Sequence, residues 1–179
     1  NLSGKLFKII GPIFRSKKVI ETNIKRAFPH IKSDDLQKIK EEMWVNYGKI
    51  FAEFMFMKSF RYGRLSQKIE MVGEEILDEI KLSKMQVVFI SGHFSNFELM
   101  AMQIEKVGIN VAAVYRPLNN IFLNSIMEKI RKTHICKKQI KKGIGGVKEL
   151  LKLTKEGYST AVMIDQRVSQ GIKTNFFNE

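Results

Sequence analysis

Three short apolar segments, each ending in a polar turn, most constrain the fold of this chain of 179 residues. They lie at 87–90, 110–115 and 158–164, and segments with helical spacing separate them. Short apolar runs are typical of buried parallel strands, which need crossover connections. The pattern therefore predicts an α/β fold in which helices cover a parallel or mixed sheet. We also expect a short strand at 69–72, a loop over the basic segment containing Gly143, Gly145 and Gly146, and helices at 74–81, 95–107, 120–133 and 147–156.

The first third of the chain has a different character. Its apolar residues recur at helical spacing over 2–14, 22–28 and 33–60. We predict a helical, membrane-proximal region over 1–68 and an α/β catalytic core over 69–179, with the C-terminal part of that core missing. Residues 2–14 form an amphipathic stretch flanked by lysine, which either packs on the core or contacts a membrane.

The charge of the chain points to anionic partners. Lys and Arg total 31 against 18 acidic residues, which gives a net charge of +13. Seven of these cations and no acid lie in 129–142. Nucleic acid, an acidic protein and an anionic membrane surface all fit such a charge. Lysine dominates over arginine, which favours diffuse attraction to phosphate or lipid over base readout. No nucleic-acid-binding motif is present, so we predict no nucleic-acid partner.

Cysteine content and apolar run length exclude two further classes of protein. The single cysteine, Cys136, excludes a disulfide framework and a multi-cysteine metal site. No apolar run approaches the roughly 18–20 residues of a membrane-spanning helix.

Polar residues follow each of the three main predicted strands. His93 follows the first, Arg116 the second, and Asp165 with Gln166 the third. Because the carboxyl ends of parallel strands meet at one edge, we expect these side chains to lie close together. Arg116 then either binds substrate or forms an ion pair with Asp165.

His93 and Glu98 stand five positions apart, at the start of a predicted helix. One interpretation is a catalytic dyad, in which the carboxylate accepts a hydrogen bond from the imidazole and orients it as a general base. The other is a capping box, in which Ser95 and Glu98 satisfy the first turn of the helix. A zinc site is disfavoured because His30 and His134 are not placed to complete one, so we predict no metal.

An ordered set of short motifs resembles the late acyltransferases of lipid A biosynthesis, the lauroyl/myristoyl transferase family. The set comprises Asn23 to Pro29, Gly92-His93-Phe94-Ser95-Asn96-Phe97-Glu98, Tyr115-Arg116-Pro117, Asp165-Gln166 and Phe176-Phe177. Members of this family usually begin with a membrane helix and extend further, so we expect a fragment.

The resemblance implies transfer of a fatty acyl chain from acyl carrier protein to a hydroxyl of a lipid A precursor. It places the reaction at the cytoplasmic face of the bacterial inner membrane, on an anionic surface, with no cofactor. His93 and Glu98 would be catalytic, and Arg116, Asp165 and Asn96 would bind substrate. The alternatives are a related acyltransferase acting on another glycolipid or phospholipid and, on charge alone, a basic nucleic-acid-binding module.

Overall fold

The structure is a computed structural model that describes residues 2–166 and residue 175. The Phe176-Phe177 motif therefore lies outside the described residues. The helices are α1 (Leu2–Phe14), α2 (Lys17–Ala27), α3 (Ser33–Met55), α4 (Met57–Tyr62), α5 (Glu74–Ser83), α6 (Glu98–Lys106), α7 (Ile121–Ile130) and α8 (Ile144–Lys155), with a 3₁₀ turn η1 (Arg64–Lys68) and a π-helical turn η2 (Arg131–Ile135). The strands are β1 (Val88–Ser91), β2 (Val111–Tyr115), β3 (Lys138–Lys141) and β4 (Ser159–Met163).

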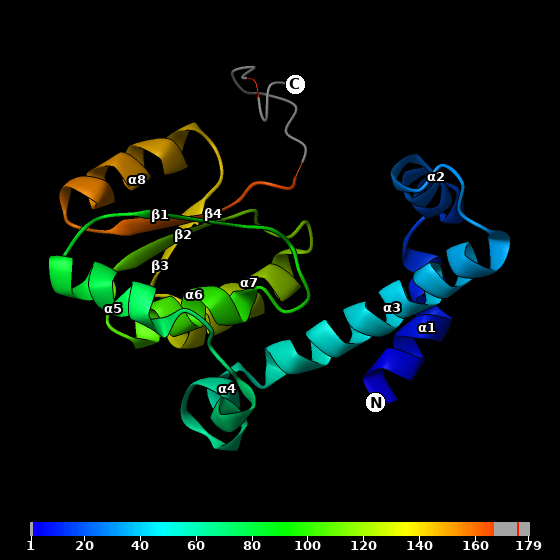
Figure 1. The fold of residues 1–179 in the computed structure, drawn as a ribbon, viewed down its shortest axis with the longest axis horizontal. Helices are drawn as coiled ribbons and strands as arrows, with labels where there is room; N and C mark the ends of the chain where they lie inside the picture. The colour runs from blue at the N-terminus through cyan, green and yellow to red at the C-terminus, as the bar shows by residue number, and fades with distance from the viewer. Residues whose placement is uncertain (1, 167–174, 176–179) are drawn as a thin grey trace.

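The N-terminal region is helical, as the sequence predicts, and its α1, α2 and much of α3 form an arm that stands away from the sheet (Figure 1). Helix α1 runs antiparallel to α3, since the Ser3 hydroxyl donates to the carbonyl of Gly48 while Lys8 pairs with Glu41 further along. In the described part of the chain, no helix is both long enough and apolar enough to cross a membrane.

The four strands form one parallel sheet in the order β1-β4-β2-β3. This confirms the predicted α/β fold with a parallel sheet. Two details of the prediction are wrong. Residues 69–72 form no strand, and β3 lies in the basic segment that was expected to be a loop. Strand β3 is a sheet edge with Ile140 as its only buried residue, so its sequence lacks the apolar run of a buried strand.

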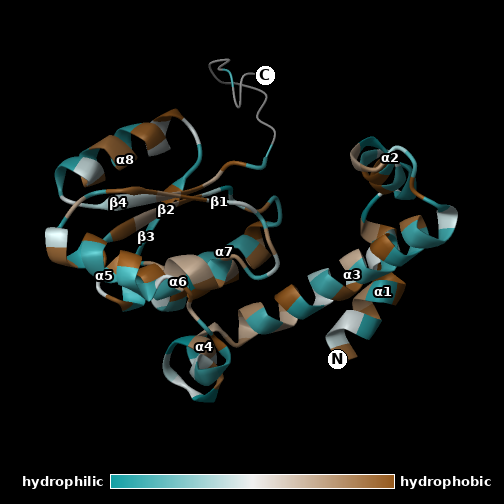
Figure 2. Cartoon of the chain, in the orientation of Figure 1, coloured by the Kyte–Doolittle hydropathy of each residue, from teal (hydrophilic) through white to brown (hydrophobic). Residues whose placement is uncertain are grey.

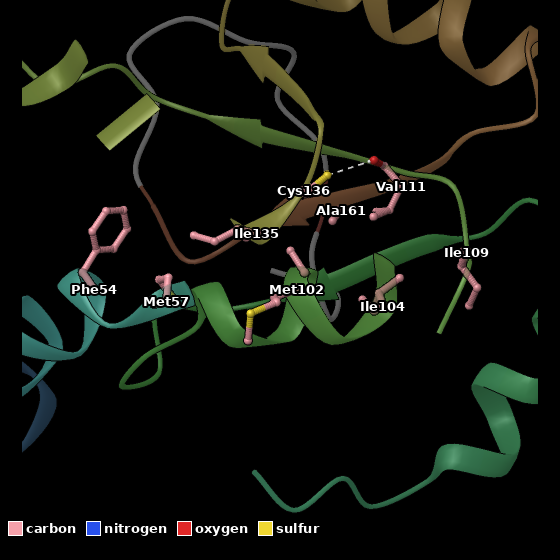
Figure 3. Close-up of a cluster of buried hydrophobic side chains, with 10 residues drawn as sticks. Phe54, Met57, Met102, Ile104, Ile109, Val111, Ile135, Cys136 and Ala161 are labelled. Atoms are coloured by element: carbon pink, nitrogen blue, oxygen red, sulfur yellow. Dashed lines mark hydrogen bonds between the residues drawn. The ribbon is translucent and has the colours of Figure 1, made fainter. Parts of the chain in front are cut away.

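Helices cover both faces of the sheet (Figure 1). Helix α8 lies on one face, and α5, α6 and α7 lie on the other. The larger core cluster joins α6, β2 and β4 to Phe54 at the end of α3 and Met57 of α4 (Figure 3). Within it, the buried Cys136 thiol donates to the carbonyl of Val111 over 3.0 Å. This core fixes β1, β2 and β4 side by side, so their carboxyl ends share one edge.

Candidate active site

A cleft of about 680 Å³ opens where β1, β4 and β2 end. His93, Glu98, Arg116, Arg131 and Gln166 are among the residues that line it. The prediction that the polar strand ends meet at one edge is therefore confirmed. They meet because β4, which is last in the sequence, lies between β1 and β2 in the sheet.

Asp165 fixes the position of His93 through two hydrogen bonds. The backbone N–H of His93 donates to Oδ2 of Asp165 over 2.6 Å, and ring Nδ1 lies 2.7 Å from Oδ1. These two donors, chiefly the backbone N–H, hold the pKa of the Asp165 carboxyl below its ordinary value. A carboxylate only accepts hydrogen bonds, so Nδ1 carries a proton, and the lone pair of the neutral imidazole is on Nε2. His93 thus has the tautomer that a general base requires.

Two further neighbours surround the imidazole. The amide nitrogen of Gln166 lies 3.2 Å from Nε2 of His93 and donates to its lone pair. The ring of Phe97 meets the imidazole edge to face, with centroids 4.6 Å apart. Gln166 is exposed, so a substrate hydroxyl that enters the cleft can replace it at Nε2.

Glu98 pairs with Arg131 and not with His93. Nε of Arg131 donates to Oε1 of Glu98 over 2.8 Å, and Nη2 donates to the same oxygen. Glu98 is 9% exposed and Arg131 8%, so the two charges compensate each other away from water. The expected hydrogen bond between Glu98 and His93 is therefore wrong, because Asp165 already engages Nδ1. Glu98 still lines the cleft, and its catalytic role remains a prediction.

The capping-box interpretation of Ser95 and Glu98 is also wrong. Helix α6 begins at Glu98 itself, and no side chain caps its N-terminus. Ser95 has left-handed backbone, with φ of +46°, and its hydroxyl donates to Oδ1 of Asn46 over 3.3 Å. Ser95 therefore connects the loop after β1 to helix α3.

Asn96 connects the same loop to α3. Its side-chain amide donates to Oε2 of Glu53 over 2.9 Å. Asn96 is not among the described residues that line the cleft. Its predicted part in substrate binding remains a prediction, and the contact observed here positions the loop that carries His93.

Arg116 lies at the cleft with an exposed side chain. It forms no ion pair or hydrogen bond with the described residues. The alternative of an ion pair with Asp165 is therefore wrong, since that carboxylate binds His93. The guanidinium is available to an anionic or carbonyl oxygen of a substrate.

The whole chain, residues 1–179, matches the family model described as bacterial lipid A biosynthesis acyltransferase. The chain belongs to this family. A search of curated proteins gave no match. Membership confirms the resemblance drawn from the ordered motifs, and it indicates an acyltransferase.

Arg131 is the residue of this acyltransferase site that sequence reasoning missed. It lies within the basic segment 129–142, whose other six cations are lysines with exposed side chains. Of these seven cations only Arg131 is buried, and its guanidinium lies 5.4 Å from the centre of the Tyr115 ring. The single arginine among lysines was the available signal, because arginine is the cation suited to buried, stacked ion pairs.

Tyr115 completes this wall of the acyltransferase cleft. Its hydroxyl donates to Oε1 of Glu128 over 2.6 Å. Burial, followed by this hydrogen bond, raises the pKa of Tyr115 well above its ordinary value, so it stays neutral. In the part of the chain that the structure describes, no three His, Cys, Asp or Glu side chains are grouped to hold a metal ion.

Proposed function

We propose that this acyltransferase moves a fatty acyl chain from an acyl carrier protein thioester to a hydroxyl of a lipid A precursor. We place the reaction at the cytoplasmic face of the bacterial inner membrane. Family membership supports the class of reaction, and the cleft supplies groups suited to it. The observation that carries the proposal is the geometry of His93, whose Nδ1 is held by Asp165 while Nε2 keeps its lone pair.

The chemical steps follow from that geometry. The acceptor hydroxyl replaces Gln166 at Nε2 of His93 and gives up its proton as its oxygen attacks the thioester carbonyl carbon. A C–O bond forms, and the carbonyl electron pair moves onto oxygen. When the carbonyl re-forms, the C–S bond breaks and the sulfur takes the proton from Nε2. Asp165 stabilises the imidazolium between these steps without taking its proton.

The cations of the cleft have separate roles. Arg116 has no partner among the described side chains and lies at the cleft, so we assign it to the developing negative oxygen or to a phosphate of the acceptor. Arg131 is a positioning residue that holds Glu98 at the cleft wall. Lys142 adds a further positive charge to the lining.

Product analysis by mass spectrometry tests the proposal. Full-length protein is incubated with acyl carrier protein loaded with one fatty acid, and with either a lipid A precursor or a hydroxyl-bearing glycerophospholipid. We expect one acyl mass to be added to the lipid A precursor, and the His93→Ala variant to lose nearly all of this activity. Acylation of the glycerophospholipid alone would support the alternative acceptor. Undiminished transfer by folded His93→Ala would overturn the mechanism.

A further inference from the structure

Helix α1 packs against α3 through its smallest residues. Gly4 and Gly11 are the buried residues of α1, and Gly48 is their counterpart on α3. A Cβ on Gly11 would lie 2.2 Å from the Trp44 ring, and one on Gly48 would lie 2.5 Å from the Ser3 carbonyl oxygen. Contact between the two helices therefore depends on glycine at these positions.

Four of the large apolar residues of α1 lie on the side away from α3. Leu2, Leu6, Ile9 and Ile13 recur at helical spacing on the side opposite the glycines, and we call them the outer stripe. Leu2 is 86% exposed, Ile9 75% and Ile13 81%. An amphipathic helix of a water-soluble domain buries its large apolar face, so α1 has the reverse arrangement.

Helix α3 extends this apolar surface. Tyr47, Phe51 and Met55 lie one turn apart, and all three are exposed. The ring of Phe51 contacts that of Phe7 on α1, with centroids 5.4 Å apart, so the two helices share the surface. The arm that carries these residues stands away from the sheet (Figure 2).

Lys5 lies beside the outer stripe on α1, and two further unpaired cations follow α1 in the chain. Lys5, Arg15 and Lys18 are exposed and form no ion pair with the described residues. Residues 1–32 as a whole carry eight Lys or Arg and one acid, Glu21. An apolar stripe beside cations complements a lipid surface, whose acyl chains are apolar and whose headgroups are anionic.

We propose that the outer stripe of α1, with the adjoining face of α3, embeds in an anionic lipid bilayer. Small residues between helices and large apolar residues on the outside are the packing typical of helices surrounded by lipid. The outer stripe contacts acyl chains, and Lys5, Arg15 and Lys18 contact headgroup phosphates. This surface is distinct from the catalytic cleft, and its occupation by lipid does not depend on which group the enzyme transfers.

Vesicle binding by the full-length protein tests this inference. We would titrate vesicles of phosphatidylglycerol and phosphatidylcholine, or of phosphatidylcholine alone, at low and high salt. Trp44 is the only tryptophan among these 179 residues and lies beside α1, so quenching of its fluorescence by brominated lipid reports embedding of the arm. The test variant is Ile9→Ser/Ile13→Ser. The matched control, Leu82→Ser/Ile144→Ser, removes two equally exposed apolar residues from α5 and α8.

We expect wild type to bind anionic vesicles more tightly than neutral ones, with salt weakening the binding. Ile9→Ser/Ile13→Ser should weaken it by roughly 10²- to 10⁴-fold, because two apolar side chains that lipid would bury are lost. The control and His93→Ala should bind like wild type, which separates this result from any failure of the acyl-transfer proposal. Equal binding by wild type and Ile9→Ser/Ile13→Ser would overturn the inference. Self-association that requires Ile9 and Ile13, without vesicle binding, would also overturn it.

Discussion

Asp165→Asn is the substitution that most directly tests how His93 is oriented. The carboxylate accepts two hydrogen bonds from His93, one from the backbone N–H and one from Nδ1. Asparagine keeps the size of the side chain but has only one acceptor oxygen. If that oxygen stays with the backbone N–H, the amide NH₂ faces Nδ1 and favours the tautomer with the proton on Nε2. His93 would then have no lone pair toward the cleft.

The expected loss follows from the function of that lone pair. General-base catalysis contributes about 10²–10⁴-fold, so Asp165→Asn should lower kcat by a factor in this range. The fold should persist, because Asp165 lies at an exposed strand end. Single-turnover rates with acyl carrier protein thioester give the rate, and far-ultraviolet circular dichroism reports folding.

A double variant makes this test specific. If Asp165 acts through His93, then His93→Ala/Asp165→Asn should be no slower than His93→Ala alone. A folded Asp165→Asn enzyme with near-normal kcat would refute the assignment of Asp165 as the orienting residue. So would additive losses in the double variant.

Three further outcomes follow from the structure. Glu98→Gln should lower the free energy of unfolding by about 3–5 kcal/mol in chemical denaturation, because it leaves the buried Arg131 charge uncompensated; unchanged stability would contradict this. Arg116→Lys should keep wild-type melting and lose at least about tenfold in rate, since lysine lacks the planar fork; a fast enzyme would refute the role of Arg116. Burial raises the pKa of Cys136 from 9.0 to about 11, so the stability due to the neutral thiol is complete below pH 9 and is lost as pH rises toward 11, by about 3 kcal/mol in all. Denaturation of Cys136→Ala should lack this difference between pH 8.5 and 11.

The sequence predicts strands β1, β2 and β4 from their apolar residues and misses the edge strand β3. Strand β2 is apolar except for its final tyrosine, and β4 is apolar from Ala161 to Met163, because helices and neighbouring strands cover them. The sequence of β3 predicts a basic loop, because both its end residues are lysines that are exposed at the edge of the sheet. Residues 69–72, in contrast, are predicted as a strand but form none. Ile69 packs against the core and Val72 is almost fully exposed. The alternation of buried and exposed side chains therefore reflects local packing, with no partner strand beside this segment.

Prediction of the candidate site from the sequence is limited in a similar way. Parallel-sheet geometry places His93 and Asp165 at one edge, and the structure confirms that they meet. Sequence spacing nevertheless predicts Glu98, five residues away, as the partner of His93, whereas the observed partner, Asp165, lies 72 residues away. Strand order decides this contact, because β4 lies next to β1 in the sheet. Local spacing carries no information on strand order, and it likewise cannot show that Glu98 meets Arg131.

Helix α3 connects the two regions that the sequence separates at residue 68. Its Asn46 and Glu53 bind the loop after β1, and its Phe54 is part of the core under the sheet. The same helix holds α1 through Gly48, on the arm where the outer stripe lies. A rigid helix therefore runs from the proposed lipid contact to the loop that carries His93. If the arm embeds in a bilayer, α3 fixes the height of the cleft above the lipid, which an enzyme acting on a membrane-borne acceptor requires.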